Sequence, residues 1–292
     1  GMASMRDIQR RKGSITSISQ ITKAMKLVST VKLQKTRRQA EESKPYFETM
    51  YEAMTSILSR SGVLEHKYTR PGETGKKAVI AISSNRGLAG GYHINLVRAV
   101  MESGLPKEDV LIYNIGRKGG EVLLRRGYQI EKDYSDVINA PLFSDAQEIC
   151  SQVLEDFEQG KVSEIYLAYT AFKNTVVHTP TLRRLLPIEI GTELTEKKEE
   201  IDKTEQNTLM NYEPDEEAVL DVIIPKYVTS LIYGGITESA ASENGARMQA
   251  MDSASKNAEE MMEKLQQQYN RARQGAITQE LTEIIAGAEA VD

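Results

Sequence analysis

The residues best suited to chemistry in this sequence form a glycine-rich turn at residues 83–91 (SSNRGLAGG). The turn follows a short apolar run and precedes a helical pattern, which is where phosphate-binding loops lie. Its spacing matches neither GxGxxG nor GxxxxGK followed by Ser or Thr, and no acidic residue about 20 positions later completes a ribose site. We therefore expect a tight strand-to-helix turn rather than a nucleotide site. Residues 116–120 (GRKGG) also follow a strand pattern and predict a solvated turn.

Other residue types offer no recognisable reaction centre. The three histidines, His66, His93 and His178, lie far apart in the sequence and lack the spacing of metal ligands. Cys150 is the only cysteine, which excludes an internal disulfide and a CxxC metal site. The sequence contains no GxSxG and no set of kinase motifs. We expect no catalytic residue, no cofactor and no metal in this chain.

Charge is distributed unevenly along the 292 residues, although the net charge is only −5. Residues 1–44 contain eleven Lys or Arg against three Asp or Glu, a balance of 11 − 3 = +8. Residues 274–292 contain four acidic residues and no basic one, a balance of −4. The basic segment lacks interleaved aromatic residues, so we do not expect nucleic acid as a partner. Opposite charge at the two ends suits terminal helices that lie side by side.

Both ends of the chain have helical periodicity. We expect a helix over about 5–58, with Pro45 marking a place for a bend, and a second helix over about 214–286. The apolar face predicted for the first helix comprises Ile8, Ile15, Ile18, Ile21, Met25, Val28 and Val31. The second helix has alternating steps of three and four at Met248, Met251, Ser255, Ala258, Met262, Leu265, Tyr269 and Ala272. That alternation is the seam of a left-handed coiled coil.

The two helices therefore predict an antiparallel coiled coil, because one leads into the middle of the chain and the other leads out of it. The second helix is the longer, so residues 276–291 would extend past its partner. This tip has no Lys or Arg but four large apolar residues, Ile277, Leu281, Ile284 and Ile285. An uncovered apolar tip either frays or fits into another protein.

The middle of the chain, about 77–190, alternates short apolar runs with amphipathic segments of about ten residues. This alternation predicts one α/β domain with a mainly parallel sheet. The expected strands are 78–82, 110–115 and 164–169, with 176–177 and 185–190 as further candidates. The expected helices are 93–101, 118–125 and 144–158. Residues 192–211 are highly charged and predict a mobile loop. No apolar run approaches the ~18 residues of a membrane span.

Several segments resemble the gamma subunits of F-type ATP synthases, in the same order and over the whole chain. The matching segments are 21–29 (ITKAMKLVS), 84–91 (SNRGLAGG), 212–215 (YEPD), 236–239 (ITES) with 242–248 (SENGARM), and 269–274 (YNRARQ) with 277–284 (ITQELTEI). The resemblance implies a bacterial-type member. Position 89 is Ala where some members carry Cys, and the dithiol insert of chloroplast relatives is absent. Light-type redox control is therefore not expected.

The resemblance implies an α/β fold plus a long antiparallel coiled coil, with the N- and C-terminal helices paired and a central Rossmann-like domain. The implied divisions are 1–60, 77–190 and 212–288. In that family the chain is the central rotor stalk, a non-catalytic subunit. Its partners are three alpha and three beta subunits, the epsilon subunit and the membrane c ring, and it couples proton flow to ATP synthesis or hydrolysis. Such a subunit lies peripherally at the cytoplasmic face of the bacterial plasma membrane.

The resemblance also implies contact residues. The residues expected to meet the lever and catch loop of beta are Lys23, Met25, Arg247, Arg273, Gln274, Thr278, Glu280 and Glu283. The residues expected at the foot, against the c ring and epsilon, are Tyr212, Glu213 and Asp215.

Two alternatives remain open on the sequence. One is a static coiled-coil scaffold that carries an α/β interaction domain. The other is a nucleotide-binding enzyme that uses the turn at residues 86–91.

Overall fold

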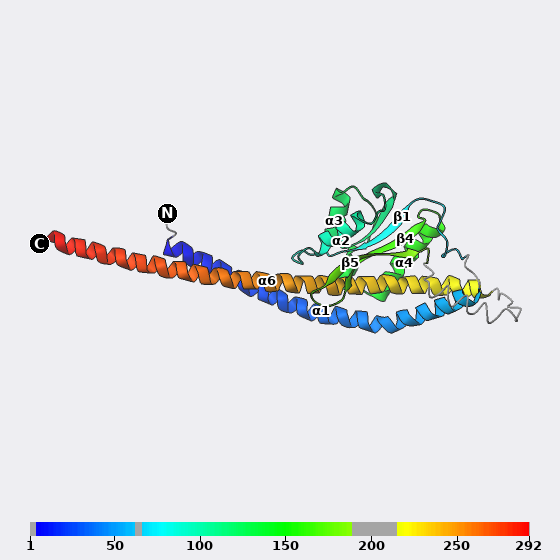
Figure 1. Ribbon diagram of the computed structural model, residues 1–292, viewed down its shortest axis with the longest axis horizontal. Coiled ribbons are helices and arrows are strands. Elements are labelled where there is room, and N and C mark those ends of the chain that lie inside the picture. Colours follow the sequence, from blue (N-terminus) through cyan, green and yellow to red (C-terminus); the bar gives the residue numbers. More distant parts are fainter. Residues whose placement is uncertain (1–3, 62–65, 189–214, 292) are drawn as a thin grey trace. The chain divides into compact units, whose positions relative to one another are not determined.

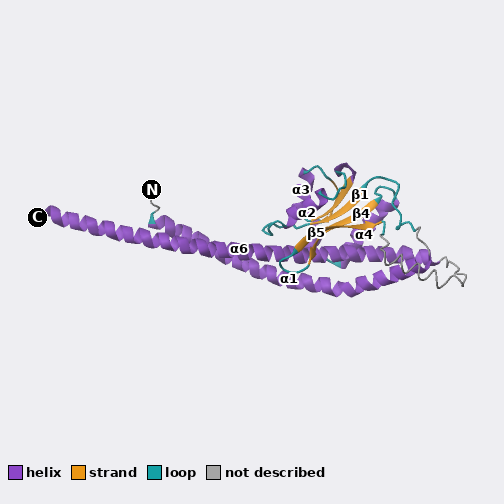
Figure 2. Ribbon diagram, viewed as in Figure 1, coloured by secondary structure: helices purple, strands orange, loops and turns teal. Residues whose placement is uncertain are grey.

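The computed structural model describes residues 4–61, 66–188 and 215–291 (Figure 1). The chain divides into two compact units. The first unit comprises Gly1–Thr30 with Arg247–Asp292, and the second comprises Val31–Ala246. The elements are α1 Met5–Ser61, β1 Lys77–Ile82, α2 Tyr92–Met101, η1 Lys107–Asp109, β2 Val110–Ile115, α3 Arg117–Arg125, β3 Gln129–Asp133, η2 Ser135–Asn139, α4 Phe143–Glu158, β4 Glu164–Phe172, β5 His178–Leu186 and α6 Asp215–Val291. The strands all lie in the second unit (Figure 2).

The five strands form one sheet in the order β3-β2-β1-β4-β5. The neighbours β3, β2, β1 and β4 are parallel, and β5 is antiparallel to β4. The mainly parallel sheet predicted from the alternating pattern is therefore confirmed. Helices connect the parallel strands, because two parallel strands cannot be joined by a tight turn.

Each face of the sheet packs against its own core. In β1, Ile80 and Ile82 belong to the core that includes residues of α4, α6 and the end of α1. The alternate residues Val79 and Ala81 belong to the core shared with α2 and α3. Successive strand residues point to opposite faces, so a strand covered on both sides reads as a continuous apolar run.

Two strand predictions need correction. The edge strand β3 was not predicted, because its sequence, QIEKD, is charged and lies at most half-buried. The two short candidates at 176–177 and 185–190 are replaced by the single strand β5. Asn174 Oδ1 accepts hydrogen bonds from the backbone N–H groups of Val176 and Val177, at 2.9 and 2.8 Å. These bonds stabilise the turn between β4 and β5. Residues 189–190 and the charged segment 192–211 lie outside the described residues.

The terminal helices are confirmed and run slightly farther than predicted. Both contain an internal proline, Pro45 in α1 and Pro225 in α6, and both continue through it. The α6 helix also contains an 18-residue stretch whose mean hydropathy of 1.4 is sufficient by composition for a membrane span. The prediction that no such stretch exists is therefore wrong. Because 56% of the stretch is buried in the protein, packing accounts for its apolar residues.

Candidate functional site

The first unit is an antiparallel coiled coil built from the start of α1 and the end of α6. The predicted α6 seam is confirmed, since all eight of its positions are buried or half-buried. Met251, Ser255, Ala258 and Leu265 are at most 6% exposed. The α6 helix therefore presents one narrow stripe of soft and small side chains to α1.

The buried stripe of α1 is made of smaller residues than the sequence pattern predicts. Ile8 is buried and Ile15 is half-buried, as expected. The other deeply buried positions are Ser19, Thr22 and Ser29, which are 2–8% exposed. Thr22 Oγ1 donates a hydrogen bond of 3.0 Å to the carbonyl of Ser19, so its hydroxyl is satisfied without a partner on α6. Small side chains of this kind allow two helices to approach closely.

Large apolar side chains of α1 lie on its uncovered face. The prediction that Ile18, Ile21 and Val28 belong to the seam is wrong, because they are 47–58% exposed. Leu27 is 66% exposed, and Val31, in the second unit, is 59% exposed. The first helix has two stripes at helical spacing, and periodicity does not say which stripe is covered.

Polar contacts across the coiled coil fix its direction and register. Lys23 Nζ lies 2.9 Å from a Glu259 carboxylate oxygen, and Lys26 Nζ lies 2.8 Å from Asp252 Oδ1. Further contacts join Gln9 to Tyr269, Lys12 to Gln266 and Thr16 to Met262. Residue numbers rise on α1 as they fall on α6, so the helices are antiparallel. The hydrogen bond from Lys26 is the main cause of a lowered pKa at Asp252.

The residues expected to meet a partner lie in four environments. Lys23 is exposed in its ion pair, and Met25 is half-buried. Arg247 is buried, at 6% exposed. The remaining five lie exposed on α6 beyond Ala272, and they are Arg273, Gln274, Thr278, Glu280 and Glu283. At the expected foot, Tyr212 and Glu213 lie outside the described residues, and Asp215 is the first residue of α6.

The tip of α6 is uncovered in its unit, as predicted. All described residues from 273 to 291 are exposed. The four large apolar side chains noted in the sequence, Ile277, Leu281, Ile284 and Ile285, are 50–62% exposed. A helix with such an apolar surface is unusual in water unless a partner covers it.

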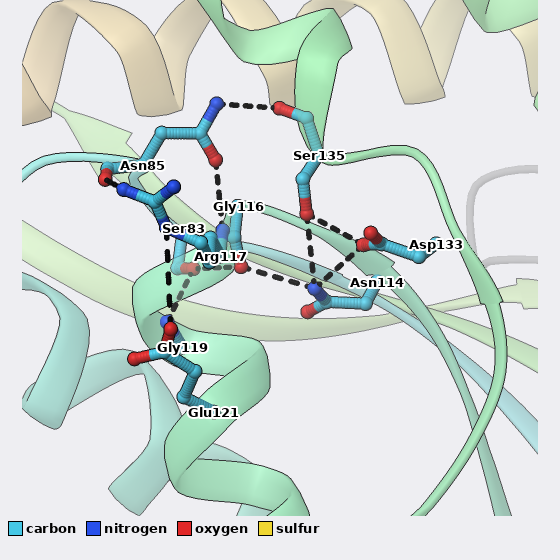
Figure 3. Close-up of polar contacts among 9 residues, drawn as sticks. All are labelled: Ser83, Asn85, Asn114, Gly116, Arg117, Gly119, Glu121, Asp133 and Ser135. Atoms are coloured by element: carbon cyan, nitrogen blue, oxygen red, sulfur yellow. Dashed lines mark hydrogen bonds and ion pairs between the residues drawn. The ribbon is translucent and has the colours of Figure 1, made fainter.

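The residues at the start of the turn after β1 cap the N-terminus of another helix, α3 (Figure 3). The backbone N–H of Arg117 donates to Asn85 Oδ1 at 2.8 Å, and that of Lys118 donates to the Ser84 carbonyl at 2.8 Å. The N–H of Gly119 donates to Ser83 Oγ at 2.9 Å. These are the groups that would otherwise bind an anion. The three residues that follow β1, Ser83, Ser84 and Asn85, therefore cap α3.

Residues 116–120 are not the solvated turn that the sequence predicts. Gly116 has φ 105°, and α3 begins at the next residue. Gly119 and Gly120 are buried. A Cβ at Gly119 would lie 2.4 Å from Ser83 Oγ, and one at Gly120 would lie 2.3 Å from Asn114 Nδ2. Glycine is required here because α3 packs directly on the ends of two strands.

A polar network joins the carboxyl ends of β1, β2 and β3 (Figure 3). Asn114 Nδ2 donates to Asp133 Oδ1 at 3.1 Å and to the Gly116 carbonyl at 3.0 Å. Asn85 Nδ2 donates to the Ser135 carbonyl at 2.7 Å. These hydrogen bonds hold the turn in place, although Asn114 Oδ1 is buried without a hydrogen-bond partner in the described part of the chain.

The segment of α6 at 235–245 fastens the sheet to the helix, and sequence reasoning missed this role. Ser239 Oγ accepts a hydrogen bond of 3.1 Å from the N–H of Thr170 in β4, and Ser242 Oγ donates one of 3.1 Å to the Thr170 carbonyl. Tyr92 Oη donates to the Ser239 carbonyl at 3.0 Å. A Cβ at Gly235 would lie 2.7 Å from Leu167 Cδ2. The signal was the small residues at 235, 239 and 242, which share one helical face.

Cys150 lies in the core beside α6 and is expected to be unreactive in the folded protein. It is 2% exposed, and burial raises the pKa of its thiol to about 11. A thiol reagent at pH 8 should label the native chain only as fast as it unfolds, and should label the urea-unfolded chain rapidly. Rapid labelling of the native chain would contradict the buried position.

The same raised pKa predicts a loss of stability in alkali. The thiolate is favoured in the unfolded chain, so its contribution to stability is complete below about pH 9 and falls as the pH rises toward 11. The expected loss of unfolding free energy from this group is roughly 3 kcal/mol well above pH 11, and about half of it has occurred by pH 10. Urea titrations at pH 8 and 10 should show this change in the natural chain and lack it in a Cys150→Ala variant.

The fold defines the class: a mainly parallel α/β domain that carries a long antiparallel pair of terminal helices with uncovered apolar side chains. Comparison with known proteins agrees. A family model described as ATP synthase matches residues 4–291. The chain is 59% identical over 291 residues to the ATP synthase gamma chain of Lachnoclostridium phytofermentans, covering 100% of both chains. It belongs to the ATP synthase gamma chain family.

Two further similarities support the family and the fold. The chain is 41% identical over 298 residues to the sodium-ion-specific ATP synthase gamma chain of Acetobacterium woodii, covering 99% of each. Its fold is similar to a chain in the rotor of the Euglena gracilis mitochondrial ATP synthase, with a TM-score of 0.62 and 18% identity. That match covers 94% of this chain and 98% of the other.

Proposed function

We propose that this chain is the central rotor stalk of a bacterial ATP synthase. In this role it turns inside a hexamer of three alpha and three beta subunits and rests, with epsilon, on a membrane c ring. Proton flow through the ring turns the stalk, and the stalk drives the beta sites through their catalytic states in turn. The ion itself is selected by the ring, and the sodium-specific relative shows that similar gamma chains occur with another ion.

The observation that carries the proposal is the division of side chains in the coiled coil. Small residues such as Ser19, Ser29 and Ala258 fill the seam, whereas Leu27 and Leu281 remain exposed. A coiled coil that functioned only as a strut would gain stability by burying its largest apolar residues. Keeping them outside costs that stability and provides apolar surfaces for a surrounding protein. The static scaffold explains this division less well, because a scaffold does not need uncovered surfaces along both helices.

The charges on the coiled coil suit a partner that changes contact as the stalk turns. Lys23 and Glu259 are 58% and 56% exposed in their ion pair. Exposed pairs of this kind contribute only about 0–1 kcal/mol, so an acidic group on a partner could replace Glu259 at little cost. The residues proposed to meet the beta lever and catch loop remain those named from the resemblance, from Lys23 and Met25 to Glu283. The proposed foot is at Tyr212, Glu213 and Asp215.

We propose a non-catalytic subunit with three parts. These are an N-terminal coiled-coil helix at 1–60, a central α/β domain at 77–190 and a C-terminal coiled-coil helix at 212–288. It also includes a peripheral position at the cytoplasmic face of the plasma membrane, reached through the partners. The exposed tip of α6 supports a mechanical role.

Reconstitution tests the proposal directly. The purified chain should lack ATPase activity, should co-purify with an alpha–beta hexamer from a close relative, and should stimulate ATP turnover by that hexamer. ATP hydrolysis by the purified chain, or its failure to enter the hexamer, would contradict the rotor function.

Substitution of Met25 tests the proposed contact. In Met25→Lys we expect assembly to remain and proton-driven ATP synthesis to fall by about tenfold, the effect of ~1.4 kcal/mol on a rate. The reason is that a third ammonium beside Lys23 and Lys26 would hold acidic groups of beta in one position. Met25→Leu is the control and should behave as the natural chain. Unchanged synthesis in Met25→Lys would remove Met25 from the contact.

A further inference from the structure

The second unit contains a cavity of about 380 Å³ between α1, the β4–β5 hairpin and α6. We refer to it as the hairpin pocket. Its lining comes from α1 residues 37–47, from β4 and β5 with the turn between them, and from α6 residues 230–241. Its volume lies within the range of roughly 300–1,000 Å³ typical of small-molecule sites. The turn at residues 83–91 contributes no residue to it.

Cationic side chains outnumber carboxylates around the hairpin pocket. The four cations come from α1, from β5 and from the hairpin turn, and they are Arg37, Lys44, Lys173 and Arg183. The two carboxylates are Glu41, which binds Arg37 Nε at 3.2 Å, and Glu238. Within the described part of the chain, Lys44 and Lys173 form no ion pair. The net lining charge of 4 − 2 = +2 favours an anionic ligand.

Three aromatic side chains line the hairpin pocket together with these cations. Phe47 reaches it from α1, and Tyr169 and Phe172 reach it from β4. The Arg37 guanidinium lies 6.0 Å from the centre of the Phe172 ring, so one cation already stacks on this wall. Aromatic side chains of this kind bind planar bases by stacking.

Two features of α6 keep the pocket open and limit its negative charge. Gly234 lines the pocket, and a Cβ at this position would meet no atom within 4 Å. Burial raises the pKa of Glu238, although the Phe172 N–H, Arg183 and Lys44 oppose this. Glu238 is therefore protonated more readily than an ordinary carboxyl, which weakens its repulsion of an anion.

We propose that the hairpin pocket binds a nucleoside phosphate, with the base against the aromatic wall of Phe47, Tyr169 and Phe172 and the phosphates among the cations. Both parts of the ligand are needed. A bare phosphate cannot stack on the aromatic wall, and a neutral base forms no ion pair with the cations. We propose binding rather than hydrolysis, because the lining hydroxyls of Ser43, Ser230 and Thr237 donate hydrogen bonds to backbone carbonyls rather than to a carboxylate. None of the lining residues is among those proposed to contact the beta lever and catch loop.

Calorimetric titration of the purified full chain with ATP, pyrophosphate and adenosine tests the site. No other subunit is present, so the nucleotide sites of a hexamer do not contribute. ATP should bind at least about tenfold more tightly than either fragment, because stacking and charged contacts act together. Added salt should weaken ATP binding. Equal binding of pyrophosphate and ATP would show a surface that attracts any polyanion, and no binding of ATP would overturn the proposal outright.

Variants of the lining locate the binding. Gly234→Leu fills open space in the pocket and replaces a helix-weakening glycine, so it should abolish ATP binding without lowering the melting temperature. Lys173→Gln should weaken binding by about tenfold, whereas Lys132→Gln, an exposed lysine on β3 outside the lining, should not change it. ATP binding that survives Gly234→Leu in a folded chain would place the ligand elsewhere. These results are independent of the rotor function, which the hexamer assay tests separately.

Discussion

Replacing Gly116 with alanine should lower the free energy of unfolding by at least about 3 kcal/mol. Gly116 has φ 105°, a conformation that L residues with a side chain rarely adopt. An added Cβ would also lie 2.4 Å from the backbone carbon of Ser83 and 2.7 Å from its carbonyl oxygen. Backbone at the end of the central strand β1 cannot move aside as the end of a flexible side chain can. The backbone strain and the steric clash therefore both contribute to the loss of stability.

Gly104→Ala is the matched control for this prediction. Gly104 has φ 83°, but an added Cβ would meet no atom within 4 Å. It shares the backbone strain without the clash, so we expect a loss of only about 1 kcal/mol. Urea unfolding followed by circular dichroism would measure both. Equal losses in the two variants would show that the contact with Ser83 is not tight and that α3 can withdraw from β1.

Exchanging the roles of small and large residues in the coiled coil should separate folding from partner binding. Ala258→Leu places a large side chain in a seam position that is 3% exposed. We expect it to force the helices apart and destabilise the first unit by about 1–3 kcal/mol. Leu27→Ser changes a side chain that is 66% exposed, so the coiled coil should remain as stable as before.

The two variants should behave oppositely toward an alpha–beta hexamer. Leu27→Ser should weaken binding by about tenfold or more, because the apolar surface of one leucine is worth ~1.5–3 kcal/mol when a partner covers it. Amide hydrogen exchange of residues 5–30 measures the coiled coil, and surface-immobilised hexamer measures binding. If Leu27→Ser bound the hexamer as tightly as the natural chain does, the uncovered face of α1 would meet no partner. If Ala258→Leu left the rate of amide hydrogen exchange unchanged, the seam would have space for a larger side chain.

Much of the fold could be predicted because it depends on local pattern. The runs that form β1, β2 and β4 are apolar and bounded by turn residues, and the segments between them have helical spacing. The α6 seam could be read without error because Met251, Leu265 and their neighbours alternate by three and four. The apolar tip at Ile277–Ile285 could be read for the same reason. In each case one stretch of chain contains the whole signal.

The sequence by itself determined the family, the alternation that builds the sheet, and the two long terminal helices. Only the tertiary structure decided which side of α1 faces α6. Two stripes of α1 have helical spacing. The stripe with the smaller side chains, at Ser19, Thr22 and Ser29, is the one that is buried, because small side chains let the two helices approach closely. The same holds for Gly116, whose need for glycine comes from Ser83, 33 positions earlier in the chain and within van der Waals contact in the fold. Local pattern fixes which elements form. Contacts between residues distant in sequence fix which faces they cover and which they leave for partners.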